Sequence, residues 1–175
     1  MTIIIHPVGD GDLGIDILSL SGEEKRRRSS ESRKHLGELI DAGRAKAVAD
    51  ALLTTSVPGG DANSRFRHTP VSLILRALKD DGGIEGPVRL LLLGSETGME
   101  GSSSDKTSLI LKRAFDMKSV RDLLEERYGF DLIVESIQHG NLYEKECFEA
   151  LGQWMEGVAD DELIVVNGIS GATMM

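Results

Sequence analysis

The alternation of short apolar runs with longer amphipathic stretches constrains the fold of this 175-residue chain more than any other feature. Four runs rich in Ile, Leu and Val are too short to be helices, and they cover Thr2–His6, Val88–Leu93, Leu132–Ile137 and Glu162–Val166. Such runs are typical of parallel strands that are buried on both faces and joined by crossover helices. The sequence therefore predicts a single α/β domain over residues 1–175, Rossmann-like, with a mostly parallel sheet flanked by helices.

The stretches between these runs carry apolar residues at helical spacing. The predicted helices are Leu36–Leu53, Val71–Lys79, Lys106–Tyr128 (one long helix or two short ones) and Asn141–Val158. We expect Thr69 to cap the second of these helices and Pro70 to open it. Ile15–Leu20 is predicted as a short extended piece or a hairpin arm. The charged segment Gly22–Lys34 is expected to be a solvated loop or an exposed helix start, or else a basic anchor for the phosphates of a ligand.

Composition narrows the class of protein further. The formal net charge of −9 and the pI near 4.9 argue against a general binder of long nucleic acids or anionic membranes, although backbone N–H groups can still hold a small phosphorylated ligand. An aromatic content of 4% argues against a stacking platform for single-stranded nucleic acid. Cys147 is the only cysteine, the opening MTIII lacks the features of a secretory signal, and the apolar runs are too short to span a bilayer. We therefore expect a soluble, cytoplasmic protein.

The end of the chain is unusual for an α/β protein. A small-residue turn, NGISGATMM, follows the last predicted strand at a point where a further helix would be needed to cover the sheet. We therefore expect a fragment of a longer protein, truncated before its last helix and before any effector domain. A naturally short chain is the alternative.

Three loops rich in Gly, Ser, Thr and Asp each follow a predicted strand directly: Pro7–Gly14, Gly94–Asp105 and Asn167–Thr173. In an open parallel sheet the carboxyl ends of the strands lie along one edge, where ligands bind. Glycine lets the backbone approach a ligand closely, and hydroxyl and amide groups bind phosphate or ribose. Any single loop is explained by the needs of a tight turn, but three loops at one edge favour a binding site. His6 at the first strand end is either a hydrogen-bonded core residue or a ligand contact, and His139 is a candidate from the same edge.

Several established motifs are missing from the sequence. There is no G-x-x-x-x-G-K-[ST] phosphate loop, no G-x-G-x-x-G dinucleotide fingerprint and no G-x-S-x-G nucleophile elbow. The GDGDLG turn resembles half of a calcium-binding loop but lacks its final glutamate, and four dispersed histidines with one cysteine do not suggest a zinc site. We therefore expect no cofactor and no bound metal.

Two motifs together resemble those of CARF (CRISPR-associated Rossmann fold) domains, the sensor domains of type III CRISPR ancillary ribonucleases. The opening TIIIHPVGDGDL is similar to the family's I-x-x-S-P-x-G-x-x-D-P, and the ending ELIVVNGISGATMM is similar to its I-x-V-N-x-[ST]-[SG]-G-T-x-x-M. Between them, HTPVSLILRAL and PVRLLLLGSET look like the family's first helix and second strand. The resemblance covers about half of the chain, and its motifs stand in the family's order.

The resemblance implies a homodimer with a two-fold axis that binds a cyclic oligoadenylate, either tetra- or hexaadenylate, across both protomers. Such a domain is an allosteric sensor that controls an attached or partner effector nuclease in antiviral defence. Carried over by position, and with His139 added from the same edge, the implied ligand-binding residues are Pro7, Gly9, Asp10, Asp12, Ser95, Glu96, Thr97, His139, Asn167, Ser170, Gly171 and Thr173.

Two other functions remain open at this point. The same pocket would act as a metal-independent phosphodiesterase if it held a ribose 2′-hydroxyl in line with the phosphate, with Ser170, Thr173, His139 or Arg65 assisting. Alternatively, the chain is an unrelated Rossmann-like domain that binds a mononucleotide, or one whose loops are only structural. We expect a binding domain rather than an enzyme, and we assign no catalytic residue.

Overall fold

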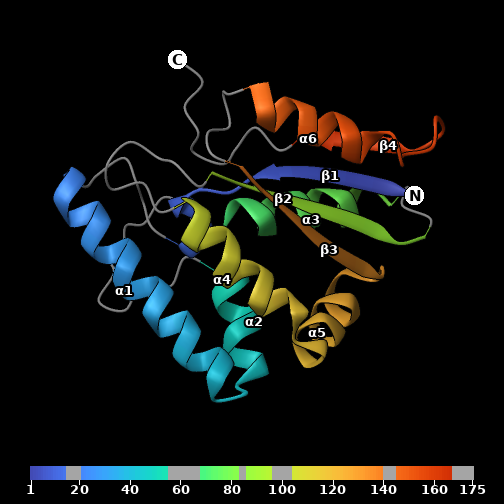
Figure 1. Cartoon of the computed structure of the whole chain (residues 1–175). Helices are drawn as coiled ribbons and strands as arrows, with labels where there is room; N and C mark the ends of the chain where they lie inside the picture. The colour runs from blue at the N-terminus through green and yellow to red at the C-terminus, as the bar shows by residue number, and fades with distance from the viewer. Residues whose placement is uncertain (15–20, 55–67, 83–85, 96–103, 140–144, 167–175) are drawn as a thin grey trace.

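The computed structural model describes residues 1–14, 21–54, 68–82, 86–95, 104–139 and 145–166, and these form an α/β fold around a parallel sheet (Figure 1). The described strands are β1 (Thr2–Pro7), β2 (Val88–Ser95), β3 (Leu132–His139) and β4 (Leu163–Val166). They lie in the order β3-β2-β1-β4 and all run parallel. The predicted Rossmann-like architecture is confirmed.

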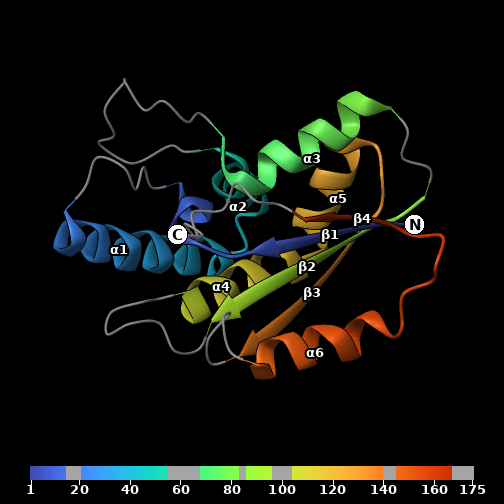
Figure 2. The same ribbon diagram turned by 90° about the horizontal axis from the view of Figure 1, so that it is seen from above.

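Helices cover both faces of this sheet. They are η1 (Asp10–Leu13, a short 3-10 helix), α1 (Gly22–Asp41), α2 (Ala45–Leu53), α3 (Pro70–Asp81), α4 (Ser104–Asp116), α5 (Lys118–Tyr128) and α6 (Lys145–Met155). The chain moves outward from β1 through β2 to β3, and then crosses back over the sheet to β4. Because right-handed crossovers in opposite directions must pass over opposite faces, α6 lies on one side, and α1, α2, α4 and α5 lie on the other (Figures 1 and 2).

The apolar side chains form one core on each face, since neighbouring residues of a strand point to opposite faces. The larger core joins the sheet to α1–α5 and includes Ile4, Leu90, Leu92, Leu52, Leu75, Leu111, Phe115 and Leu124. The smaller core lies under α6 and consists of Ile3, Ile5, Leu91 and Leu93, packed against Leu151, Trp154 and Met155. Trp154 also donates from Nε1 to Oε2 of Glu135 at 2.9 Å, and the guanidinium of Arg89 lies 4.7 Å from its ring. This cluster attaches α6 to β2 and β3.

The charged segment after residue 21 turns out to be a helix start, one of the two structures expected for it. Ser21 caps α1, because its hydroxyl accepts a hydrogen bond from the N–H of Glu24 at 3.3 Å. The predicted helix Leu36–Leu53 was wrong as a single unit: it is the end of α1 followed by α2. Gly43 lies between them at φ +65°, a left-handed conformation that favours glycine and breaks the helix.

Two of the other helix predictions can be compared directly with the structure. For Lys106–Tyr128 the alternative of two short helices is the observed one, since Met117 is extended and caps α5. The cap of α3 is confirmed: Thr69 Oγ1 accepts from Ser72 N at 3.2 Å, and Pro70 is the first helical residue. The Ile15–Leu20 prediction lies outside the described residues. None of the helices in the described segments is long and apolar enough to cross a membrane.

Strand β4 leaves apolar side chains in solvent. Leu163, Ile164 and Val166 are 57%, 38% and 63% exposed, whereas the residues of β1 that pair with β4 are buried. In the segments that the structure describes, no further helix covers this strand, and the expected covering helix stays a prediction.

Candidate functional site

The order of the strands places a topological switch point between β1 and β4. From β1 the chain first builds the sheet toward β2 and β3, and it then returns to add β4 on the opposite side of β1. Ile5 pairs with Val166, so the carboxyl ends of these two strands are neighbours in the sheet. In open α/β sheets the crevice beyond the carboxyl ends at such a point is where ligands bind. The first and last of the three predicted loops are therefore the main candidates for a binding site.

The first loop is an ordered turn. Val8 N–H donates to the carbonyl of Leu93 at 2.9 Å, which continues the strand pairing, and the chain then forms η1. Gly14 ends η1 at φ 74°, where a side chain would be strained. Gly11 lies against the start of α3, since a β-carbon added to it would be 3.4 Å from Cγ of Pro70. The loop is thus packed onto α3 rather than projecting freely.

A buried His–Asp pair fixes this loop to the end of β1. His6 Nε2 and Asp12 Oδ1 are 2.9 Å apart, and the two side chains are 0% and 1% exposed. The second carboxylate oxygen of Asp12 accepts from Gly9 N at 2.9 Å. His6 is therefore a hydrogen-bonded core residue, one of its two predicted roles. Because both side chains are enclosed and hydrogen-bonded to each other, this pair holds the backbone of the first loop in place.

The remaining predicted site residues divide into two groups. Pro7 ends β1 and is half-buried, Gly9 is half-buried before η1, and Asp10 is the first residue of η1. Ser95 and His139 are the last residues of β2 and β3 and pair with each other in register, so the structure brings them together at the same edge. Outside the described residues lie Arg65, Glu96, Thr97, Asn167, Ser170, Gly171 and Thr173.

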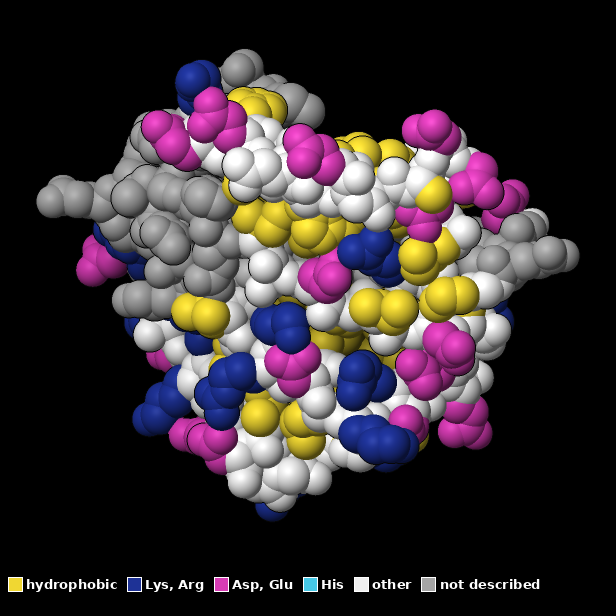
Figure 3. Space-filling model, turned by 45° about the vertical axis from the view of Figure 1, so that its right-hand side comes forward, with side chains coloured by type: hydrophobic (Ala, Val, Ile, Leu, Met, Phe, Trp, Pro, Cys, Tyr) yellow, Lys and Arg dark blue, Asp and Glu magenta, His cyan; other side chains and the backbone are white. Residues whose placement is uncertain are grey.

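No family model matches this sequence, and no curated protein or solved structure matches the chain. Its chemistry therefore has to be inferred from its own residues. Among the described residues no group of three or more His, Cys, Asp or Glu side chains is placed to hold a metal ion. On the face shown in Figure 3, Lys and Arg side chains alternate with Asp and Glu, and neither sign forms a continuous patch.

A second group of polar atoms near this edge was not predicted. Four buried atoms on α1 and α4 have no hydrogen-bond partner: Ser29 Oγ, Arg33 Nη1, Thr107 Oγ1 and Ser108 Oγ. A buried polar group left unpaired costs about 1–3 kcal/mol, so four on two adjacent helices call for an explanation. The available sequence signal was the spacing of Ser29, Arg33, Leu36 and Ile40, which puts two polar residues on the stripe that α1 buries.

Proposed function

We propose that this chain is the sensor domain of a cyclic oligoadenylate response and that the ring lies across the carboxyl edge of the sheet. One observation supports this most directly. The two segments that resemble the CARF motifs contain β1 and β4, and these strands are parallel neighbours although more than 150 residues separate them. A shared site for the two motifs requires this adjacency, which neither motif implies by itself.

The first loop has the properties that a phosphodiester ligand needs. Its fold is fixed before any ligand arrives, because the two oxygens of Asp12 are engaged by His6 and by the N–H of Gly9. Because the loop is already ordered, less of the binding free energy is lost in ordering it. Backbone N–H groups at such turns bind phosphate without a basic side chain, which suits a chain of net charge −9.

The proposed assembly is a homodimer with one ring between two identical edges. A ring of repeating adenylates presents the same groups to both protomers, so a two-fold arrangement uses each loop twice. The ring would favour one dimer arrangement over another and so control an attached or partner nuclease. The proposed role is binding rather than cleavage, since the only buried titratable pair described at this edge is enclosed and engaged.

Calorimetric titration with cyclic tetraadenylate and cyclic hexaadenylate tests the proposal. We expect one ring per dimer to bind with high affinity, and we expect Asn167→Ala and Ser170→Ala each to weaken binding by about 1–3 kcal/mol through loss of a buried partner. Ser119→Ala, on an exposed position of α5, is the matched control and should leave affinity unchanged. Failure of both rings to bind would refute the proposal. Analysis of the ligand after incubation separates a sensor, which returns it intact, from a ring-cleaving phosphodiesterase.

A further inference from the structure

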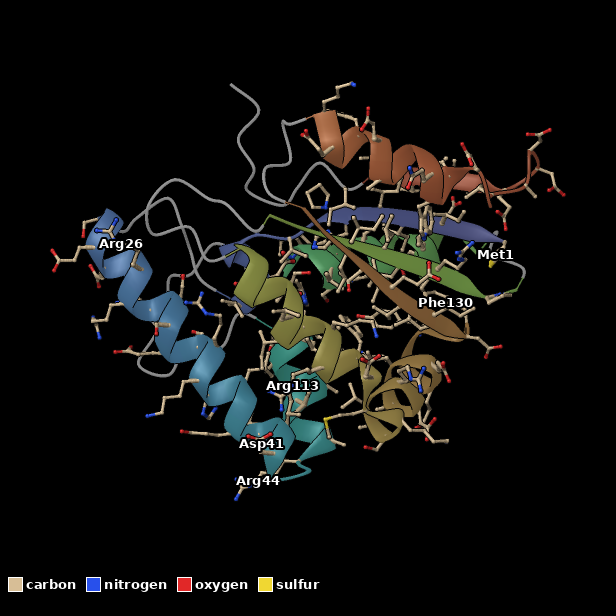
Figure 4. All side chains as sticks on the ribbon, viewed as in Figure 1. Met1, Arg26, Asp41, Arg44, Arg113 and Phe130 are labelled. Carbon is tan, nitrogen blue, oxygen red and sulfur yellow. The ribbon has the colours of Figure 1, made fainter. Side chains whose placement is uncertain are left out.

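Helices α1 and α4 pack side by side and run in the same direction, with their amino ends toward the carboxyl edge of the sheet (Figures 1 and 4). Two contacts fix their relative register. A β-carbon added to Gly37 would lie 3.7 Å from Cδ1 of Ile110, and Arg113 Nη2 donates to Oδ1 of Asp41 at 2.8 Å. Each contact therefore pairs a residue of α1 with a residue of α4 at the same height.

Extending this register by one turn toward the amino ends brings Arg33 level with Thr107. Arg33 precedes Gly37 by four residues and Thr107 precedes Ile110 by three, which correspond to about 6 Å and about 4.5 Å along the helix axes. Arg33 Nη1 and Thr107 Oγ1 are both enclosed and unpartnered. Ser29 lies one further turn along the same side of α1. Arg33 Nη1 and Thr107 Oγ1 therefore lie at the same height of the two helices, next to the start of α4.

The chemistry of these atoms selects an anion. A guanidinium is permanently charged and only donates, and serine and threonine hydroxyls donate as well. The first turn of α4 adds the positive end of its dipole. Two other arginines of α1 are already paired, since Arg27 binds Glu31 and Arg28 binds Glu24. Arg33 has no such carboxylate partner among the described residues.

We propose that Arg33 and Thr107, with Ser29 one turn further along α1, form a phosphate-binding subsite between α1 and α4. Ser29 and Thr107 are 1% and 0% exposed, so an occupant with several acceptor oxygens would satisfy groups that water does not reach freely. The group bound is a phosphate, either free or as a phosphodiester of a nucleotide ligand. The subsite is consistent with the proposed sensor function but does not require the ligand to be cyclic.

Thermal unfolding of the whole chain in inorganic phosphate, compared with sodium chloride of equal ionic strength, tests the subsite. We expect phosphate to raise the melting temperature of the wild-type protein, since a ligand that binds only the folded state stabilises it. Arg33→Gln should weaken the apparent affinity by about tenfold or more. Arg27→Gln is the matched control, because it removes the same charge from an exposed position of the same helix and should retain the full response.

Thr107→Val separates a binding role from a structural one. Valine keeps the shape of threonine and removes an unpartnered buried hydroxyl, so this variant should melt at or above the wild-type temperature in chloride. The same variant should lose most of the response to phosphate. The proposal is overturned if wild-type protein does not respond to phosphate, or if Arg33→Gln and Arg27→Gln respond equally.

Titration of the same variants with cyclic tetraadenylate and AMP identifies the source of the phosphate. Weaker ring binding in Arg33→Gln than in Arg27→Gln supports the subsite and places a ring phosphodiester in it. If AMP but not the ring depends on Arg33, the subsite holds and serves a mononucleotide. If neither ring binds any variant while the phosphate response still needs Arg33, the subsite stands and the sensor proposal fails. If rings bind and no phosphate response depends on Arg33, the subsite is wrong and the sensor proposal stands.

Discussion

Replacement of Asp12 tests whether the buried His–Asp pair holds the first loop in shape. Asp12 is 2% exposed, and its carboxylate engages the Nε2 of His6 and the N–H of Gly9, each at 2.9 Å. Asp12→Ala leaves the buried imidazole of His6 and the half-buried N–H of Gly9 without this acceptor. Each unpaired donor costs about 1–3 kcal/mol, so the variant should lose about 2–6 kcal/mol of unfolding free energy. This loss is a large fraction of the free energy of unfolding of a typical folded domain, which is roughly 5–15 kcal/mol.

Asp12→Asn refines the same test. The amide oxygen can still accept from the N–H of Gly9, but the amide nitrogen then faces His6 Nε2, which must become an acceptor by changing tautomer. We therefore expect the asparagine variant to lose about 1–3 kcal/mol, less than the alanine variant. This order of the two variants follows from the hydrogen bonds alone and does not depend on the identity of any ligand.

Urea unfolding followed by far-ultraviolet circular dichroism measures these losses, with the free energy obtained by linear extrapolation. Asp122→Ala is the control, because Asp122 is 55% exposed and pairs with Lys118 on the surface of α5. It should change the free energy of unfolding by less than about 0.5 kcal/mol. The reasoning is refuted if Asp12→Ala is as mild as this control, or if Asp12→Asn is the more damaging of the two variants.

Two further substitutions test how the helices are attached. Trp154→Phe keeps an aromatic ring under α6 but removes the N–H that binds Glu135, so unfolding in urea should show a loss of about 1–2 kcal/mol, and an unchanged curve would contradict this account. Thr69→Val removes the cap that accepts from Ser72 and the hydroxyl that donates to the carbonyl of Leu52 at 2.6 Å, and it should cost about 1–3 kcal/mol. Thr69→Ser keeps both bonds, so a serine variant that is as unstable as the valine variant would show that these bonds are not responsible.

The strands could be predicted because their signal is local and strong. A run such as Leu90–Leu93 has no polar face, so it fits only a strand buried on both sides. The division of Leu36–Leu53 was missed for the opposite reason: apolar residues at helical spacing continue on both sides of the break, and only the left-handed backbone of Gly43 separates the two helices. The spacing of apolar residues along one segment does not contain the backbone conformation of Gly43, so it could not locate the break.

The candidate site was predictable only in outline. Strand ends in a parallel sheet share an edge by geometry, which is why Pro7, Ser95 and His139 could be assigned to one region from the sequence. The interaction of His6 with Asp12 depends on the 3-10 turn between them, and nothing in the spacing of the two residues indicates it. The contact between α1 and α4 joins segments more than 70 residues apart, so the sequence revealed neither their register nor the unpartnered atoms there.

The net charge of −9 bears on what the surface of this protein attracts or repels more than on what its interior can bind. Acidic residues on α1 compensate two residues of its basic run locally, in the pairs of Arg27 with Glu31 and Arg28 with Glu24. The binding free energy of an enclosed anion depends mainly on groups within a few ångströms, because exposed charges beyond about 10 Å are screened by salt. An overall acidic chain can therefore exclude long polyanions from its surface and still bind single phosphates at the edge of its sheet.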